Sequence, residues 1–181
     1  MGDANEESVW LQRSRNGDHA AFALLVGAHQ RMIHSITFRM TGSMAEAEDL
    51  AQETFIRAYQ QLDSYRGESK FSTWLGRIAV NLTLNWRARE GHRGDVHAKW
   101  AQDAITEPAS NDEFPDELSR RVQAALQRLP AAQRAAIILT VYENQSHAEA
   151  ARALNCTEAT ISWRVFAARH KLRRWLNGIS P

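Results

Sequence analysis

The sequence is poor in the features that cross-link a chain or anchor it in a membrane. It has one cysteine, Cys156, among 181 residues, which excludes a disulfide within the chain. No apolar run approaches the roughly 20 residues that a membrane-spanning helix needs. The first eight residues are polar and acidic, unlike the basic and then apolar start of a signal peptide. These features predict a cytoplasmic protein that is not inserted in a membrane.

The chain also lacks an excess of either charge. Lys and Arg total 22 against 21 for Asp and Glu, and hydrophobic residues make up 44%. This globular composition predicts a packed core. Affinity for nucleic acid would therefore have to come from local segregation of charge. Such segregation is present, because residues 164–174 carry five basic and no acidic side chains, whereas residues 103–117 are rich in Asp and Glu.

Motifs for catalysis or metal binding are scarce. No glycine-rich phosphate loop occurs, and the histidines form no helical pair with a third ligand. His92 and His97 lie in an aperiodic segment and give only a weak indication of a metal site. Cys156 sits at a predicted turn between helices, where packing explains it better than a role as a nucleophile. We therefore predict no enzyme, metal or cofactor.

The periodicity of the first half predicts three helices. Apolar residues recur every three or four positions over 22–40, with Asp18 placed to cap that helix. Ser43 and Glu46 have capping-box spacing, so a second helix should begin at Met44. Residues 63–69 read as a loop, and a third helix should run over 70–89 until Gly91 and Gly94 end it. No strand-like alternation appears anywhere, and the fold class is all-α.

The second half predicts a separate helical domain. Periodicity disappears over 91–114, which we interpret as a flexible acidic linker between domains 1–90 and 115–181. Pro115 suits the first turn of a new helix, and another helix should include 137–142. Ser146 opens a capping box with a glutamate three residues later, for a short helix ending near residue 154. Asn155 suits a left-handed turn, and Thr157 can cap the last helix.

The short helix, turn and final helix have the arrangement that places one helix in the DNA major groove. The alternative is a helical hairpin with a solvated basic face. Residues near the start of the final helix would meet base edges, and later cations would contact phosphates. The candidates for base edges are Thr157, Glu158, Thr160, Ser162, Trp163 and Arg164, and those for phosphates are Arg169, Lys171, Arg173 and Arg174. Trp163 would either contact a thymine methyl group or pack internally.

The first domain mixes aromatic, basic and amide side chains around its loop and third helix. Aromatic faces stack on exposed bases and cations neutralise the backbone of single-stranded nucleic acid. The residues are Tyr65, Arg66, Lys70, Phe71, Trp74, Arg77, Asn81, Asn85, Arg87 and Arg89. Phe71 and Trp74 lie on the apolar stripe, so the competing interpretation places them in the core. The polar face of the second helix, around Asp49 and Gln52, would by default be a solvated surface.

Three ordered segments resemble extracytoplasmic-function (ECF) sigma factors, group IV of the housekeeping-type sigma factors. They are DLAQETF at 49–55, FSTWLGRIAVN at 71–81 and LPAAQR at 129–134, before the helix-turn-helix. The match covers nearly the whole chain in the correct order. It implies an alternative sigma factor that binds core RNA polymerase and directs it to specific promoters. The implied partners are the clamp helices of the largest subunit, the flap region, promoter DNA and a separate anti-sigma factor.

The resemblance also implies a role for each surface. The clamp helices would be bound by Asp49, Gln52, Glu53, Phe55 and Ile56. The −10 element would be melted, with a flipped base captured, by Asp63, Ser64, Tyr65, Arg66, Lys70, Trp74, Arg77, Asn81 and Asn85. The final helix would read the −35 element as duplex, and the acidic linker would run near the RNA exit path. These roles are expectations from the family.

The chain departs from the family pattern in its final helix. Ala159 stands where a glycine is usual, Ser162 and Trp163 where a lysine and a serine are common, and Ala167 where an arginine is frequent. Its contacts with −35 DNA can therefore differ residue by residue. Two rival functions are a sigma-like decoy that only binds an anti-sigma factor, and a conventional helix-turn-helix regulator that does not contact the polymerase clamp.

Overall fold

All regular secondary structure in the described part of the chain is helical. The computed structural model describes the backbone of residues 3–97 and 117–176, and the side chains of 6–89 and 117–176. Its helices are α1 (Asp3–Arg15), α2 (His19–Thr41), α3 (Met44–Gln60), η1 (Leu62–Ser64), α4 (Phe71–His97), α5 (Glu117–Gln127), α6 (Ala131–Ile137), η3 (Ile138–Tyr142), α7 (His147–Ala153) and α8 (Glu158–Leu176). The all-α prediction is confirmed, and none of the described helices is long and apolar enough to cross a membrane.

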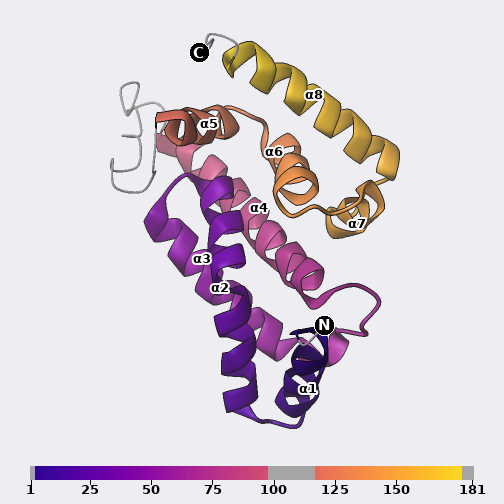
Figure 1. The fold of residues 1–181 in the computed structure, drawn as a ribbon. Coiled ribbons are helices and arrows are strands. Elements are labelled where there is room, and N and C mark those ends of the chain that lie inside the picture. Colours follow the sequence, from indigo (N-terminus) through magenta and orange to yellow (C-terminus); the bar gives the residue numbers. More distant parts are fainter. Residues whose placement is uncertain (1–2, 98–116, 177–181) are drawn as a thin grey trace.

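Helices α2, α3 and α4 form a bundle, and α1 lies beside the lower end of α2 in the view of Figure 1. The predicted apolar stripes supply its core, in which Ile33, Ile36, Phe71 and Leu75 are almost completely buried. Burying side chains of this size contributes about 1.5–3 kcal/mol each relative to exposure. This bundle is the support on which the loop over 61–70 is held.

One predicted helix cap of the first domain is confirmed and one is wrong. The Asp18 side chain accepts a hydrogen bond from the Ala21 amide at 3.1 Å. Ser43 does stand at the start of α3, but its side chain makes no capping hydrogen bond. The Thr41 hydroxyl accepts from the Ser43 amide at 3.3 Å instead, taking the donor that Glu46 would have bound in a capping box.

Two helix boundaries also differ from the prediction. Residues 3–15 form α1, which the acidic N-terminus did not indicate. Helix α4 continues through Gly91 and Gly94 to His97, so the part of the expected linker before residue 98 is helical. Glycine lowers helix propensity by only about 1 kcal/mol, which does not force a helix to end. The remainder of the expected linker, and Pro115, lie outside the described residues.

The second domain contains the predicted helix-turn-helix. Ser146 and Glu149 make both hydrogen bonds of the capping box at the start of α7, and Asn155 has the left-handed φ of 48°. The Thr157 hydroxyl accepts from the Thr160 amide at 3.2 Å and so caps α8. The helix expected around 137–142 continues α6 as a π-helical turn. Helix α8 covers both α6 and α7.

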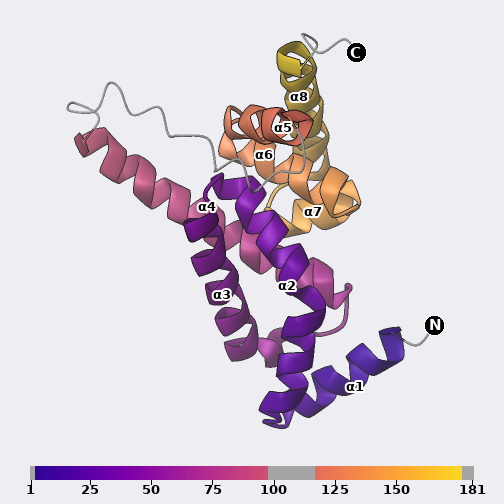
Figure 2. The ribbon, with the colours of Figure 1, turned by 60° about the vertical axis from the view of Figure 1, so that its left-hand side comes forward.

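The two domains pack against each other. Helices α5 and α6 contact α2, and α6 and α7 contact α4. In the view of Figure 2 the second domain lies above the upper end of α2. The helix-turn-helix therefore lies beside the first domain's own candidate nucleic-acid residues.

Candidate nucleic-acid and polymerase surfaces

The polar face of α3 is presented outward. Asp49, Gln52 and Ile56 are exposed, and their i, i+3, i+7 spacing places them on one side of the helix. The Ile56 side chain is 52% exposed, although it is apolar. Glu53 forms an ion pair with Arg57 at 2.7 Å, whereas Phe55 is half-buried against the core. The sequence-predicted polymerase residues thus form an exposed face with Phe55 beneath it.

The loop over 61–70 is held by its own aromatic residue. Tyr65 donates from its hydroxyl to the Ser69 carbonyl at 2.7 Å. Its ring centroid lies 5.4 Å from those of Phe71 and Trp74, distances at which aromatic pairs attract. Gly67 has a φ of +73°, which a residue with a side chain rarely adopts. The loop is therefore fixed to the start of α4, because Phe71 is buried there.

Helix α1 contributes side chains to this loop that the sequence did not indicate. Arg15 donates from its guanidinium to the Tyr65 carbonyl, and the guanidinium carbon lies 5.9 Å from the Tyr65 ring centroid. Glu7 pairs with His29 at 2.6 Å, and the His29 ring packs on Phe71. Burial, together with the negative charge of Glu7, raises the pKa of Tyr65. These contacts join residues far apart in sequence, so no local pattern could reveal them.

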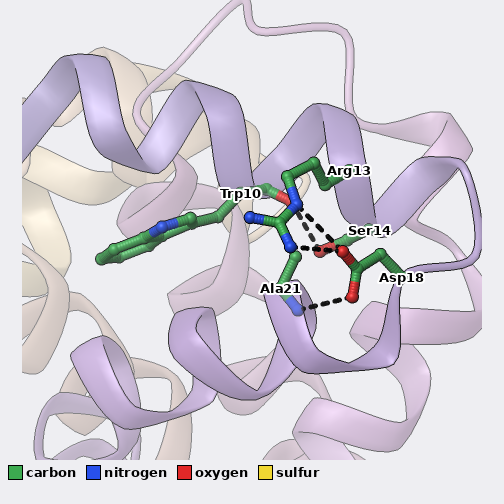
Figure 3. A network of polar contacts seen from close by, with 5 residues as sticks. All are labelled: Trp10, Arg13, Ser14, Asp18 and Ala21. Carbon is green, nitrogen blue, oxygen red and sulfur yellow. Dashed lines mark hydrogen bonds and ion pairs between the residues drawn. The ribbon is translucent and has the colours of Figure 1, made fainter.

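The corner between α1 and α2 fixes the direction of α1 (Figure 3). Arg13 pairs with Asp18 at 2.7 Å, while Asp18 also caps α2 through the Ala21 amide. That amide, and then Arg13, lower the pKa of Asp18. One turn back, the Ser14 hydroxyl donates to the Trp10 carbonyl at 2.6 Å. Arg15 is thereby brought to the loop.

A groove of about 620 Å³ lies between the loop, α4 and the second domain. Seven of the nine predicted −10 residues line it, namely Ser64, Tyr65, Arg66, Trp74, Arg77, Asn81 and Asn85. Asp63 and Lys70 are exposed and do not line it. Trp74 is half-buried, packing on the core while also facing the groove, so the two interpretations of Trp74 are compatible. Phe71 is buried in the core.

The groove is cationic and is closed on one side by the helix-turn-helix. Four arginines and two glutamates line it, so positive charge predominates. Glu149, Arg152 and Ala153 of the second domain form part of its wall. Asn81 donates from its side-chain amide to the Ala153 carbonyl at 3.4 Å. Cations with aromatic faces suit an unstacked strand of nucleic acid.

The start of α8 presents a mixed surface. Trp163 is 62% exposed, which is inconsistent with the interpretation that it packs internally. Ser162 is exposed and its hydroxyl is hydrogen-bonded to His147 at 2.9 Å. Arg164 is half-buried and donates to the Cys156 sulfur at 3.5 Å. The other predicted base-edge residues are Thr157 and Glu158, both exposed, and Thr160, half-buried.

Phe166 was missed by the sequence analysis. It is 72% exposed and lies one turn after Trp163 on α8, off the buried stripe of Ile161 and Val165. That departure from the stripe is the signal that could have identified it. Among the predicted phosphate residues Arg169 and Arg173 are exposed, whereas Lys171 donates to the Gln133 side chain at 3.1 Å.

The described residues contain no group of three His, Cys, Asp or Glu side chains that could hold a metal ion. The side chains of His92 and His97 lie outside that part of the chain. Nothing in the described arrangement therefore adds to the weak sequence indication of a metal.

Comparison with known proteins gives consistent matches for both domains. The family models Sigma-70 region 2 and Sigma-70, region 4 match residues 25–93 and 119–172. The RNA polymerase sigma-H factor of Pseudomonas aeruginosa is 36% identical over 181 residues, covering 94% of each chain. The ECF RNA polymerase sigma-E factor of Escherichia coli K12 is 35% identical over 182 residues, covering 95% of each.

Solved structures show the same architecture. The sigma factor RpoE from Bartonella quintana, in complex with the anti-sigma factor NepR, superposes with a TM-score of 0.68 at 27% identity, covering 86% of this chain and 96% of that one. CnrH, in complex with the cytosolic domain of CnrY, shares the fold with a TM-score of 0.69 at 24% identity, covering 97% of this chain and 99% of the other. The likeness thus extends to the arrangement of both domains.

Proposed function

Because the chain belongs to the family of ECF sigma factors, we propose that three separate surfaces of it bind core polymerase, the −10 strand and the −35 element. It is an alternative sigma factor, which binds core RNA polymerase and directs it to specific promoters. Residues 1–90 form the polymerase-binding and −10 domain and residues 115–181 the −35 domain. The chain acts in the cytoplasm by binding alone, and the polymerase performs nucleotidyl transfer.

The outward face of α3 binds the clamp helices of the largest polymerase subunit. The support is the exposure of Asp49, Gln52 and Ile56 on one side of the helix, where an apolar side chain amid polar ones suits a protein interface. Glu53 adds charge at the rim, and Phe55 supports the face from below. Binding to polymerase accounts for the exposed apolar Ile56 on this polar face of α3, which exposure to solvent alone does not explain.

The groove beside α4 captures the −10 strand. The observation that carries this proposal is that seven predicted residues from a loop and a helix line one cationic groove. Asp63 and Lys70 would contact the strand at its exposed edge. A groove that binds unstacked bases lowers the free-energy cost of strand separation, because the separated strand gains contacts that duplex DNA cannot make.

The start of α8 reads the −35 element. Trp163 and Ser162, with Thr157, Glu158, Thr160 and Arg164, lie where an inserted helix meets base edges. Exposed Trp163 offers an apolar face for a thymine methyl group. The phosphates are contacted by Arg169, Lys171 and Arg173, and Lys171 must leave Gln133 to do so.

A separate anti-sigma factor regulates the chain. The support is that the similar sigma factor RpoE was solved with the anti-sigma factor NepR. Such a regulator would bind the same chain that core polymerase binds, so the two would compete. A prediction of this proposal is that promoter-directed transcription is abolished by the regulator and restored by excess core polymerase.

Run-off transcription tests the proposed division of surfaces. Promoters are first identified by mapping transcript starts after overexpression, and purified chain is then added to core polymerase on those templates. Gln52→Ala with Ile56→Ala should lower the affinity for core polymerase, whereas Gln30→Ala, exposed on α2, should not. A chain that binds core polymerase but yields no specific transcript would support the rival function of a sigma-like decoy that only binds an anti-sigma factor. Unchanged transcription by the double variant would support a conventional regulator.

A further inference from the structure

Helix α1 is attached to the rest of the first domain near each of its ends. Close to its start, Glu7 pairs with His29 of α2 at 2.6 Å. At its end, Arg15 donates to the Tyr65 carbonyl in the loop over 61–70. The two attachment points are about two turns of helix apart. Two separated contacts fix the direction of α1 as well as its position.

Both attachments lead to the aromatic cluster of Tyr65, Phe71 and Trp74. The His29 ring centroid lies 5.5 Å from that of Phe71, with the ring planes inclined by 66°, which is the edge-to-face geometry that aromatic pairs favour. Phe71 is buried and its ring centroid lies 5.4 Å from that of Tyr65. Tyr65 and Trp74 line the groove beside α4, whereas Glu7 and His29 do not. Helix α1 therefore reaches the groove only through this cluster.

Glu7 determines how the His29 ring is oriented. A carboxylate can only accept a hydrogen bond, so the Nε2 atom of His29 carries a proton and donates it to Glu7. The side chains of Glu7 and His29 are 29% and 14% exposed, so water screens their attraction less than that of a fully exposed ion pair. An imidazole ring released from Glu7 could rotate, and its edge would no longer be fixed against Phe71. The pair thus connects the position of α1 to the packing of the aromatic cluster.

We propose that Glu7 and His29 are positioning residues for the −10 strand. They hold the Tyr65 ring and the start of α4 in the arrangement that accepts an unstacked base. A ring and a loop that are ordered before DNA binds increase the affinity, because binding then costs less conformational entropy. The positioning of the loop stands on the contacts alone, whereas its effect on DNA rests on the proposed function of the groove.

The first test measures the affinity of the full chain for a single-stranded −10 oligonucleotide from a mapped promoter. Glu7→Ala should weaken binding about fivefold. Glu6→Ala is the matched control, because Glu6 is exposed on the same helix and its replacement removes the same charge. Glu7→Gln should restore most of the affinity, since its side-chain oxygen can still accept from His29. In a His29→Phe chain, which keeps a ring against Phe71, adding Glu7→Ala should cause no further loss.

Removing single bases from the same oligonucleotide shows whether the loss concerns one base. Tyr65→Ala first identifies the base that Tyr65 contacts, as the position at which an abasic site makes the parent and this variant bind equally. At that position the loss caused by Glu7→Ala should disappear as well, and at the other positions it should persist. A domain that is merely destabilised would lose affinity for every oligonucleotide of the set.

Hydrogen exchange of the free chain tests the positioning without DNA. The amides of Ser64 and Tyr65 form hydrogen bonds within the loop over 61–70, so a less tightly held loop exposes them to exchange more often. Peptides that cover the loop should exchange several-fold faster in Glu7→Ala than in Glu6→Ala. Peptides from α3 should exchange alike in both variants, which shows that the domain as a whole is still folded.

These measurements separate the positioning role from the function on which it rests. Equal loop exchange in Glu7→Ala and Glu6→Ala would overturn the positioning role, whatever the affinities for DNA. A Glu7→Ala loss that persists at the abasic position would overturn the claim that the pair acts through Tyr65. Faster loop exchange, together with a Tyr65→Ala chain that binds the oligonucleotide as tightly as the parent, would contradict the proposed role of the groove while leaving the positioning of the loop supported.

Discussion

Replacing Arg15 by alanine should weaken capture of the −10 strand without altering the polymerase-binding face. Arg15 contacts the loop through the Tyr65 carbonyl and the Tyr65 ring. A hydrogen bond from a charged donor contributes about 1.5–3 kcal/mol, which we reduce to about 1 kcal/mol because Arg15 is exposed. That corresponds to a loss of about fivefold in affinity for single-stranded −10 DNA.

The assay for this prediction is fluorescence anisotropy with an oligonucleotide taken from a mapped promoter. Gln12→Ala is the control, because Gln12 is exposed on the same helix and takes no part in the Arg13–Asp18 pair or the Arg15–Tyr65 contact. Arg15→Lys should restore part of the affinity, since a lysine keeps the charge but not the planar donor. Equal affinities for the Arg15→Ala and Gln12→Ala proteins would refute the reasoning that α1 positions the loop.

Three further predictions concern stability and salt. Ser146→Ala should lower the free energy of unfolding by about 1 kcal/mol in a denaturant titration, because it removes the α7 cap. The Ser146 amide and hydroxyl lower the pKa of Glu149, so this carboxylate stabilises the fold above its unfolded pKa, and the stabilisation is lost as pH falls through the lowered folded pKa. Glu149→Gln should therefore reduce the dependence of the free energy of unfolding on pH in this acid range. An unchanged pH profile in the variant would contradict this role of Glu149. Arg169→Gln and Arg173→Gln should each reduce the salt slope of duplex binding by about one unit, and an unaltered slope would exclude phosphate contacts.

Local patterns identified those parts of the fold that depend on neighbouring residues. The capping box at Ser146 and the left-handed conformation of Asn155 could be predicted because each depends on residues only a few positions away. The similar spacing at Ser43 failed because the Thr41 hydroxyl competes for the same amide. Spacing alone could not show that competition, since it depends on how the chain turns at Gly42.

Long-range contacts determined what the sequence could not reveal. Helix α1 has few apolar side chains in a stripe, and it is fixed by the distant pairs of Glu7 with His29 and of Arg15 with Tyr65. Likewise, Arg134 lies in a recognisable motif, yet its contact with Met40 joins residues of different domains. The candidate site was predictable as a set of residue types, whereas its groove and its closure by α7 required the packed structure.

Strand opening at the −10 element is the most direct test of the central account. Permanganate reactivity of promoter thymines can be measured with core polymerase and the purified chain on a mapped promoter. We predict reactive thymines at the −10 element with the parent chain, and their loss in an Asn81→Ala, Arg77→Ala variant that still binds core polymerase. Undiminished thymine reactivity with that variant would contradict the claim that the groove beside α4 holds the separated strand.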